Sequence, residues 1–66
     1  MKIRIDTETD TLYFQIMDKD IVESEEIRRG FILDYDKDGN VVGVEILGIS
    51  DKASAEDLKK MEFLTA

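Results

Sequence analysis

The sequence predicts an α+β fold: an antiparallel β-meander of about five strands over residues 1–49, with one C-terminal helix over residues 53–65 packed on one face. Two observations support this prediction. Apolar and polar residues alternate along most of the chain before Gly48, which is typical of strands with one buried face. After Gly48, apolar residues recur at a helical spacing. The chain of 66 residues is therefore expected to form one small domain with a marginal core.

The first two predicted strands form a hairpin whose register follows from parity. Directly opposed residues of an antiparallel pair share a face, so the apolar residues of the two strands must oppose one another. A turn over residues 7–10 achieves this, because it places Ile5 opposite Leu12 and Ile3 opposite Phe14.

A second hairpin is predicted around the Asp-Gly dipeptide at residues 38–39. Asp-Gly favours a two-residue turn, and such a turn would place Leu33 opposite Val44. A four-residue loop over residues 36–39 would place Leu33 opposite Val42 instead. Both loops keep the apolar residues on one face, so the pattern is compatible with either.

Two further elements complete the prediction. Residues 21–27 have apolar ends and an acidic centre, which indicates an irregular strand, and a turn follows at residues 28–30. Ser54 can cap the C-terminal helix together with Asp57, three residues later. A single short helix is unstable alone in water, so it is expected to cover the inner face of the sheet. That face comprises Ile3, Ile5, Leu12, Phe14, Ile16, Phe31, Leu33, Tyr35, Val42, Val44 and Ile46.

The segments "MKIRIDTETDTLYFQI" and "GFILDYDKDGNVVGVEIL" resemble a family of small prokaryotic proteins known as domain of unknown function 2283. The resemblance begins at residue 1 and extends to the region of residue 50, and "LDYDKDGNVVGVEIL" is its most specific part. It implies strand–turn–strand structure for both segments and supplies no catalytic residues. It also favours a role as the antitoxin-like partner of a small toxin.

The segment "DYDKDGNVVGVE" matches a calcium-loop pattern, with Asp34, Asp36, Asp38, Gly39 and Glu45 at the required positions. An EF-hand also needs a helix on each side, whereas both flanks here have strand patterns. Asp and Gly equally suit a turn between strands, so a hairpin is the preferred interpretation. Asp34, Asp36, Asp38 and Glu45 are the candidate ligands of the alternative, a weak divalent-cation site. No cofactor is expected.

The charge of the chain bears on its partners. Sixteen acidic and nine basic residues give a formal net charge of −7. This charge disfavours nucleic-acid binding and makes a basic protein an easier partner. Glu23, Glu25 and Glu26 are the candidate partner-binding residues. The preferred interpretation of these glutamates is that they protect a strand edge from aggregation.

A homodimer is a further hypothesis. By parity, Tyr13, Met17, Ile32 and Val41 point away from the predicted core. If these residues gather into one patch, the patch needs cover. Two copies could therefore associate through this face or through an exposed strand edge.

The sequence contains neither histidine nor cysteine, and its serines have no catalytic partner. With sixteen carboxylates, some pair must be close, so a pair alone does not indicate catalysis. We therefore expect no enzymatic activity. No signal region or membrane-length apolar run is present, so a cytoplasmic location without membrane association is expected. The favoured function is a non-enzymatic protein-interaction module, with a structural homodimer as another alternative.

Overall fold

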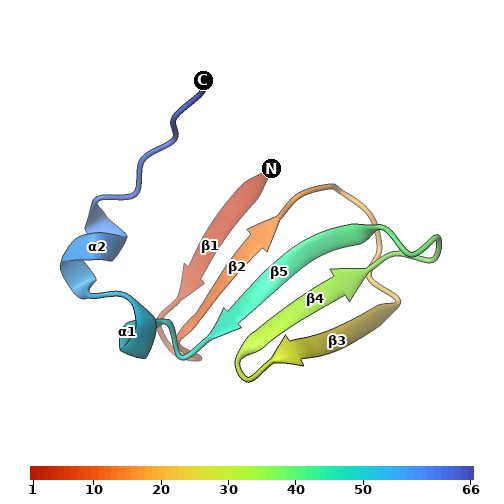
Figure 1. Cartoon of the computed structure of the whole chain (residues 1–66), viewed down its shortest axis with the longest axis horizontal. Coiled ribbons are helices and arrows are strands. Elements are labelled where there is room, and N and C mark those ends of the chain that lie inside the picture. Colours follow the sequence, from red (N-terminus) through yellow and green to blue (C-terminus); the bar gives the residue numbers. More distant parts are fainter.

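The computed structural model describes residues 1–66 and consists of one five-stranded antiparallel sheet and two short helices (Figure 1). The α+β class and the antiparallel sheet are thus confirmed. Neither helix has the length and apolar content needed to cross a membrane. The elements are β1 (Lys2–Asp6), β2 (Thr11–Gln15), β3 (Glu23–Arg28), β4 (Phe31–Tyr35), β5 (Val41–Leu47), α1 (Ile49–Lys52) and α2 (Ala55–Lys59).

The strands do not follow one another in sequence order across the sheet. Their order is β1-β2-β5-β4-β3, so β5 lies in the centre and pairs with β2 on one side and β4 on the other (Figure 1). The expectation of a simple meander is wrong here. The largely apolar β5 has both of its edges paired in this central place. The acidic β3 lies at an outer edge of the sheet, where charge resists further pairing.

The register of the first hairpin is confirmed. Ile5 lies opposite Leu12, and Ile3 lies opposite Phe14. The turn is stabilised by the Asp6 carboxylate, which accepts hydrogen bonds from the backbone N–H groups of Glu8 and Thr9.

The second hairpin combines a predicted register with an unexpected loop. Leu33 lies opposite Val44, as a two-residue turn requires. Beyond Asp34 the register shifts, so that Tyr35 lies opposite Val41 and the loop runs over residues 36–40. Both predicted loop lengths are therefore wrong. A β-bulge in β5 absorbs the extra residue.

The predicted helix over residues 53–65 is replaced by two shorter helices. Ala53 is extended, with φ of −136°, and separates α1 from α2. The predicted capping box is confirmed, because the Ser54 side chain accepts from the Asp57 backbone and the Asp57 side chain accepts from the Ser54 backbone. However, α2 ends at Lys59, and the residues that follow it are exposed.

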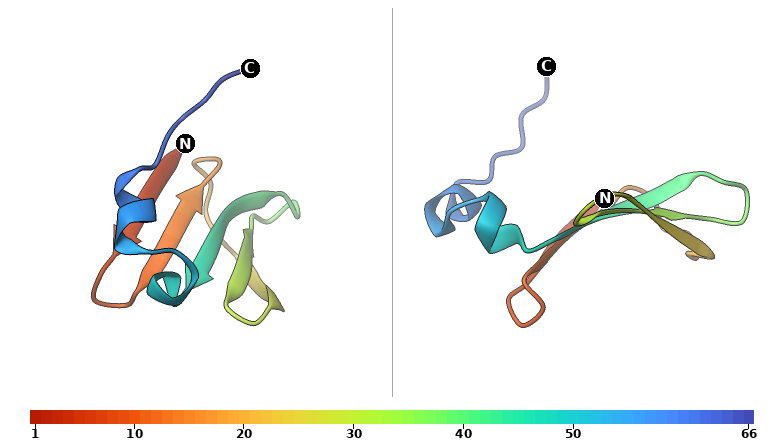
Figure 2. Two further views of the ribbon diagram at one scale, coloured as in Figure 1. Left: turned by 60° about the vertical axis from the view of Figure 1, so that its left-hand side comes forward. Right: turned by 60° about the horizontal axis from the view of Figure 1, so that its bottom comes forward.

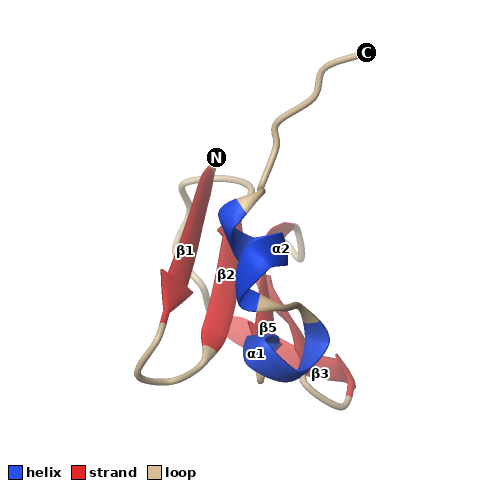
Figure 3. Cartoon of the chain, turned by 90° about the vertical axis from the view of Figure 1, so that its left-hand side faces the viewer, coloured by secondary structure: helices blue, strands red, loops and turns tan.

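The helices also fail to cover the sheet, contrary to expectation. Seen down the shortest axis of the molecule, all five strands are in view and both helices lie to one side (Figure 1). Figures 2 and 3 show the same single twisted layer, with the C-terminal segment projecting away from it. Of the helical residues, only Ile49 is buried, and its backbone N–H donates to the Asp10 carbonyl.

One face of the sheet is therefore apolar and uncovered. We call it the apolar face, and the strand registers place on it Ile3, Ile5, Leu12, Phe14, Phe31, Leu33, Tyr35, Val41, Val44 and Ile46. None of these side chains is buried, and Ile3 is 51% exposed. The buried hydrophobic side chains are Val42 and Ile49. The core of this chain is correspondingly small.

Deleting residues 55–66 is expected to leave the sheet intact. This segment contains no buried residue, and losses at exposed positions have small effects on stability. We expect the free energy of unfolding to fall by less than about 1 kcal/mol, as measured by urea denaturation. A much larger loss would show that α2 packs on the sheet in solution.

Candidate functional site

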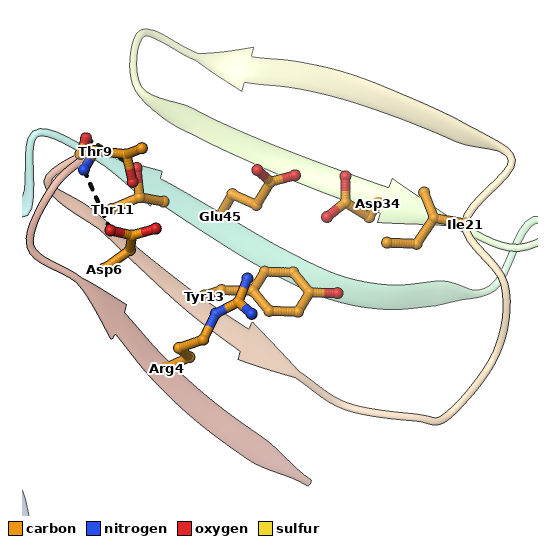
Figure 4. A pocket seen from close by; sticks show the side chains of 8 residues that line it. All are labelled: Arg4, Asp6, Thr9, Thr11, Tyr13, Ile21, Asp34 and Glu45. Atoms are coloured by element: carbon orange, nitrogen blue, oxygen red, sulfur yellow. Dashed lines mark hydrogen bonds between the residues drawn. The ribbon is translucent and has the colours of Figure 1, made fainter.

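The face opposite the apolar face is hollowed and polar. A cavity of ≈ 360 Å³ opens there above β1, β2, β5 and β4 (Figure 4). Such a volume is at the lower end of small-molecule sites. The residues that line it are Arg4, Asp6, Thr9, Thr11, Tyr13, Ile21, Asp34 and Glu45.

Asp34 is the most unusual residue of this cavity, because it is a carboxylate that is only 1% exposed. One of its oxygens, Oδ1, accepts a hydrogen bond of 2.6 Å from the Ser24 hydroxyl on β3. The other oxygen, Oδ2, is buried without a hydrogen-bond partner. Leaving a buried polar atom unsatisfied is costly, so Oδ2 is an acceptor suited to a hydrogen-bond donor.

Glu45 is the acidic neighbour of Asp34 on the adjacent strand β5. Asp34 lies opposite Gly43, and Glu45 is two residues further along β5 on the same face, so the two carboxyl groups are diagonal neighbours (Figure 4). A hydrogen bond to Asp34 raises the pKa of Glu45, and burial and the negative charge of Asp34 raise it further. The negative charge of Asp34 makes ionisation of Glu45 less favourable, so the two side chains form an acidic pair on this face.

The Tyr13 side chain lies beside the pair formed by Asp34 and Glu45 (Figure 4). Its side chain crosses Gly43, and a β-carbon at Gly43 would lie 2.6 Å from the Tyr13 hydroxyl oxygen. Burial raises the pKa of Tyr13, and the nearby charges of Asp34 and Glu45 raise it further, so the hydroxyl is neutral near pH 7. The absence of a side chain at Gly43 is what allows the ring to lie beside the carboxyl pair.

The four candidate calcium ligands do not meet at one point. Asp34 and Glu45 lie in the cavity, whereas Asp36 and Asp38 belong to the hairpin loop. The structure contains no group of three or more acidic, histidine or cysteine side chains able to hold a metal ion. Both flanks of the loop are strands, β4 and β5, so the helical context of an EF-hand is absent.

The carboxylate of Asp36 is occupied by its own loop. Its Oδ1 accepts from the backbone N–H groups of Asp38 and Asn40, each at 2.9 Å, and its Oδ2 accepts from the Asn40 side chain at 3.1 Å. The backbone hydrogen bond from Asn40 is the main reason why the pKa of Asp36 is lowered. Asp36, one of the four candidate calcium ligands, therefore stabilises the turn of the hairpin.

Replacing Asp36 with alanine is expected to destabilise the protein and to reduce its sensitivity to acid. A lowered folded-state pKa contributes stability that is present above the unfolded-state pKa of about 3.9 and is lost as the pH falls through the folded-state value. Thermal unfolding of both proteins between pH 2 and pH 7 measures this. If the two melting curves shift in parallel over the whole range, the Asp36 carboxylate has no such role.

The three candidate partner-binding glutamates are divided between the two faces of β3, and all three are exposed. Glu23 and Glu25 lie opposite Tyr35 and Leu33, so they border the apolar face. Glu26 lies opposite Ile32 on the other face. The hydroxyl of Tyr35 donates to Glu25 at 3.4 Å, which fixes this glutamate beside the apolar face.

Two members of the predicted homodimer patch, Tyr13 and Ile32, do lie on the face opposite the apolar face, in one row with Glu45 between them. The prediction for Val41 is wrong, because the shifted register sets it opposite Tyr35 and therefore on the apolar face. Met17 lies beyond the end of β2. Sequence reasoning missed the pairing of Asp34 with Glu45. Their proximity depends on the β4–β5 register, and the available signal was Gly43, a glycine within a strand, which marks close approach of another group.

Comparison with known proteins identifies the family. Residues 2–50 match the family described as protein of unknown function (DUF2283). The chain belongs to this family. The match spans all five strands and the first residues of α1, so the DUF2283 region includes both faces of the sheet. Neither the curated proteins nor the solved structures include a match.

Proposed function

We propose that this DUF2283 chain is a non-enzymatic protein-interaction module whose apolar face docks on a partner protein. The supporting observation is the uncovered apolar face. Stable domains consist of at least two packed layers, because a sheet must bury its apolar face against another element. Here the second layer is missing, and a partner protein would supply it.

The charge around the apolar face favours a basic partner. Glu23 and Glu25 border it along β3, and the whole chain carries a formal net charge of −7. A second copy of the chain would bring a second acidic border and the same net charge. A partner with an apolar surface and basic residues around it is complementary in both respects. An antitoxin-like role beside a small basic toxin is the specific form of this proposal.

The apolar face can be tested with two neighbouring substitutions on β4. Leu33 lies on the apolar face and Ile32 on the opposite face, and both are half-buried. The wild-type chain is used to capture partners from cells that express it naturally, and each captured protein is purified and titrated directly. Leu33→Lys should abolish direct binding of a basic partner, whereas Ile32→Lys should retain it. Equal binding by both variants would refute the proposal.

Sedimentation tests whether a second copy of the chain, instead of a partner protein, covers the apolar face. The purified wild-type chain is expected to be monomeric at micromolar concentration. A stable dimer that Leu33→Lys dissociates would show that a second copy covers the apolar face and would overturn the basic-partner proposal.

Two matched substitutions on β3 test the glutamates that border the apolar face. Glu25→Lys reverses a charge beside the apolar face, while Glu26→Lys makes the same change on the opposite face. Binding of the partner should weaken for Glu25→Lys and depend on salt concentration in the wild type. An equal effect of both variants would indicate attraction by net charge alone.

A further inference from the structure

The cavity on the polar face contains a buried acceptor that the fold leaves unused. Asp34 lines this cavity, is 1% exposed, and has no hydrogen-bond partner at Oδ2. Pairing of β4 with β3 and β5 fixes the backbone at Asp34, and the hydrogen bond from Ser24 restrains its side chain in this inward position. A buried anionic oxygen fixed at the wall of a cavity is suited to a cationic group.

Three oxygen-bearing side chains converge here. The carboxylates of Asp34 and Glu45 point toward each other, and the Tyr13 ring lies alongside them over Gly43 (Figure 4). A primary ammonium has three N–H donors and one positive charge, which matches three oxygen acceptors that include two acidic groups. A divalent metal ion is matched less well, since the cavity offers it no third acidic, histidine or cysteine ligand at this point.

We propose that the cavity binds a small primary amine, whose ammonium group is held by Asp34 and Glu45 with the Tyr13 hydroxyl as a third acceptor. Binding of the ammonium favours the ionised form of Glu45, and any proton that Glu45 carries is released to solvent. The other charged and polar groups that line the cavity are Arg4, Asp6, Thr9 and Thr11. On β3, Ser24 donates to the other oxygen of Asp34, and Glu26 lies on the same face of the sheet. The proposal is independent of docking at the apolar face, because the cavity is on the opposite face of the sheet.

The first test compares two cations of equal charge. The full chain, labelled with ¹³C, is titrated at pH 7 with butylammonium and with tetramethylammonium, which has no N–H donor. Butylammonium should shift the carboxyl signals of Asp34 and Glu45 in a saturable manner and lower the midpoint pH of the Glu45 titration. Tetramethylammonium should do neither. Equal responses to the two cations would overturn the proposal, because they would show an effect of ionic strength only.

The second test uses variants that remove charge and keep shape. Asp34→Asn and Glu45→Gln should each weaken butylammonium binding at least about tenfold, since each removes a charge-assisted hydrogen bond. Glu8→Gln, in the exposed loop of the first hairpin, serves as the matched control and should leave the affinity unchanged. If Asp34→Asn does not fold, Glu45→Gln and the cation comparison decide the matter. Equal affinity in all three variants would overturn the proposal.

A titration with calcium tests whether the cavity binds a divalent cation instead of an amine. In the same experiment, calcium chloride should shift the Asp34 and Glu45 signals less than butylammonium does at equal concentration. Saturable calcium binding that excludes butylammonium would overturn the proposal and identify the cavity as a divalent-cation site.

Discussion

Replacing Gly43 with alanine is expected to destabilise the protein by about 1–3 kcal/mol, because the substitution overpacks the centre of the sheet. A β-carbon there would lie 2.6 Å from the Tyr13 hydroxyl oxygen and 2.8 Å from the Phe14 carbonyl oxygen. The ring can move aside, but the carbonyl belongs to the β2 backbone and cannot move without disturbing the β2–β5 pairing. Each 1 kcal/mol lowers Tm by about 4–8 °C in a domain of this size. Thermal unfolding followed by circular dichroism measures the change.

The control for this variant is Gly39→Asn. Gly39 has a φ of +82° and open space around its β-carbon position, and asparagine tolerates the left-handed region better than most residues. This variant should lose less stability than Gly43→Ala. The double variant Tyr13→Ala/Gly43→Ala separates the two clashes, since it removes only the contact with the ring. The double variant is compared with Tyr13→Ala alone, and equal stability of these two proteins would show that the Phe14 carbonyl does not contribute.

Replacing Glu45 with glutamine is expected to stabilise the protein at neutral pH. Glutamine is nearly the same shape and can donate an N–H to the buried Oδ2 of Asp34. In the wild type, ionisation of Glu45 places a second negative charge beside Asp34 in a partly buried position. The variant should therefore unfold at a higher temperature than the wild type at pH 7.

The stability gained by Glu45→Gln is expected to depend on pH. The pKa of Glu45 is raised in the folded state, so its contribution to stability is fully present below the unfolded-state pKa of about 4.3. That contribution is lost as the pH rises through the folded-state value. The advantage of Glu45→Gln should thus grow from pH 4 upward and vanish near pH 4. Glu8→Gln, in an exposed loop, should track the wild type throughout. A constant advantage at every pH would mean that the carboxyl pair is not the cause.

Short-range pattern was sufficient to predict much of the sheet. Ile3 opposite Phe14 and Leu33 opposite Val44 follow from parity alone, because a slip of one residue would turn a whole set of apolar side chains to the other face. The capping box at Ser54 also follows from spacing. These features depend on residues that are close in the sequence.

The predictions that failed depend on contacts between segments far apart in the sequence, or on a loop in which two local preferences compete. The pairing of β2 with β5 competes with other strand orders that satisfy the same alternation, so the pattern cannot distinguish them. The helix over residues 53–65 was expected from the spacing of its apolar residues and from the Ser54 cap. Its packing on the sheet was expected because a short helix is unstable alone, and the structure has two shorter helices that leave the apolar face uncovered. The Asp36 carboxylate, by bonding to Asn40, gives the hairpin a loop that the Asp-Gly dipeptide alone does not require.

The candidate site was only partly predictable for the same reason. Asp34 and Glu45 were singled out as calcium ligands, at loop positions that assume a helical context. The strand register instead places them diagonally on one face, away from Asp36. Burial of Asp34 and the lack of a partner at its Oδ2 depend on the whole sheet, so no local pattern reveals them.

The central position of β5 has a consequence for how the chain folds during synthesis. The hairpins β1–β2 and β3–β4 are complete once residue 35 has been made, yet they do not pair with each other. Only β5, the final strand to leave the ribosome, joins them. Domains acquire their structure as the chain is made, and pairing between distant segments is slow. Until β5 emerges, the edges of β2 and β4 that it will join remain unpaired, so the sheet cannot be completed before its last strand is made.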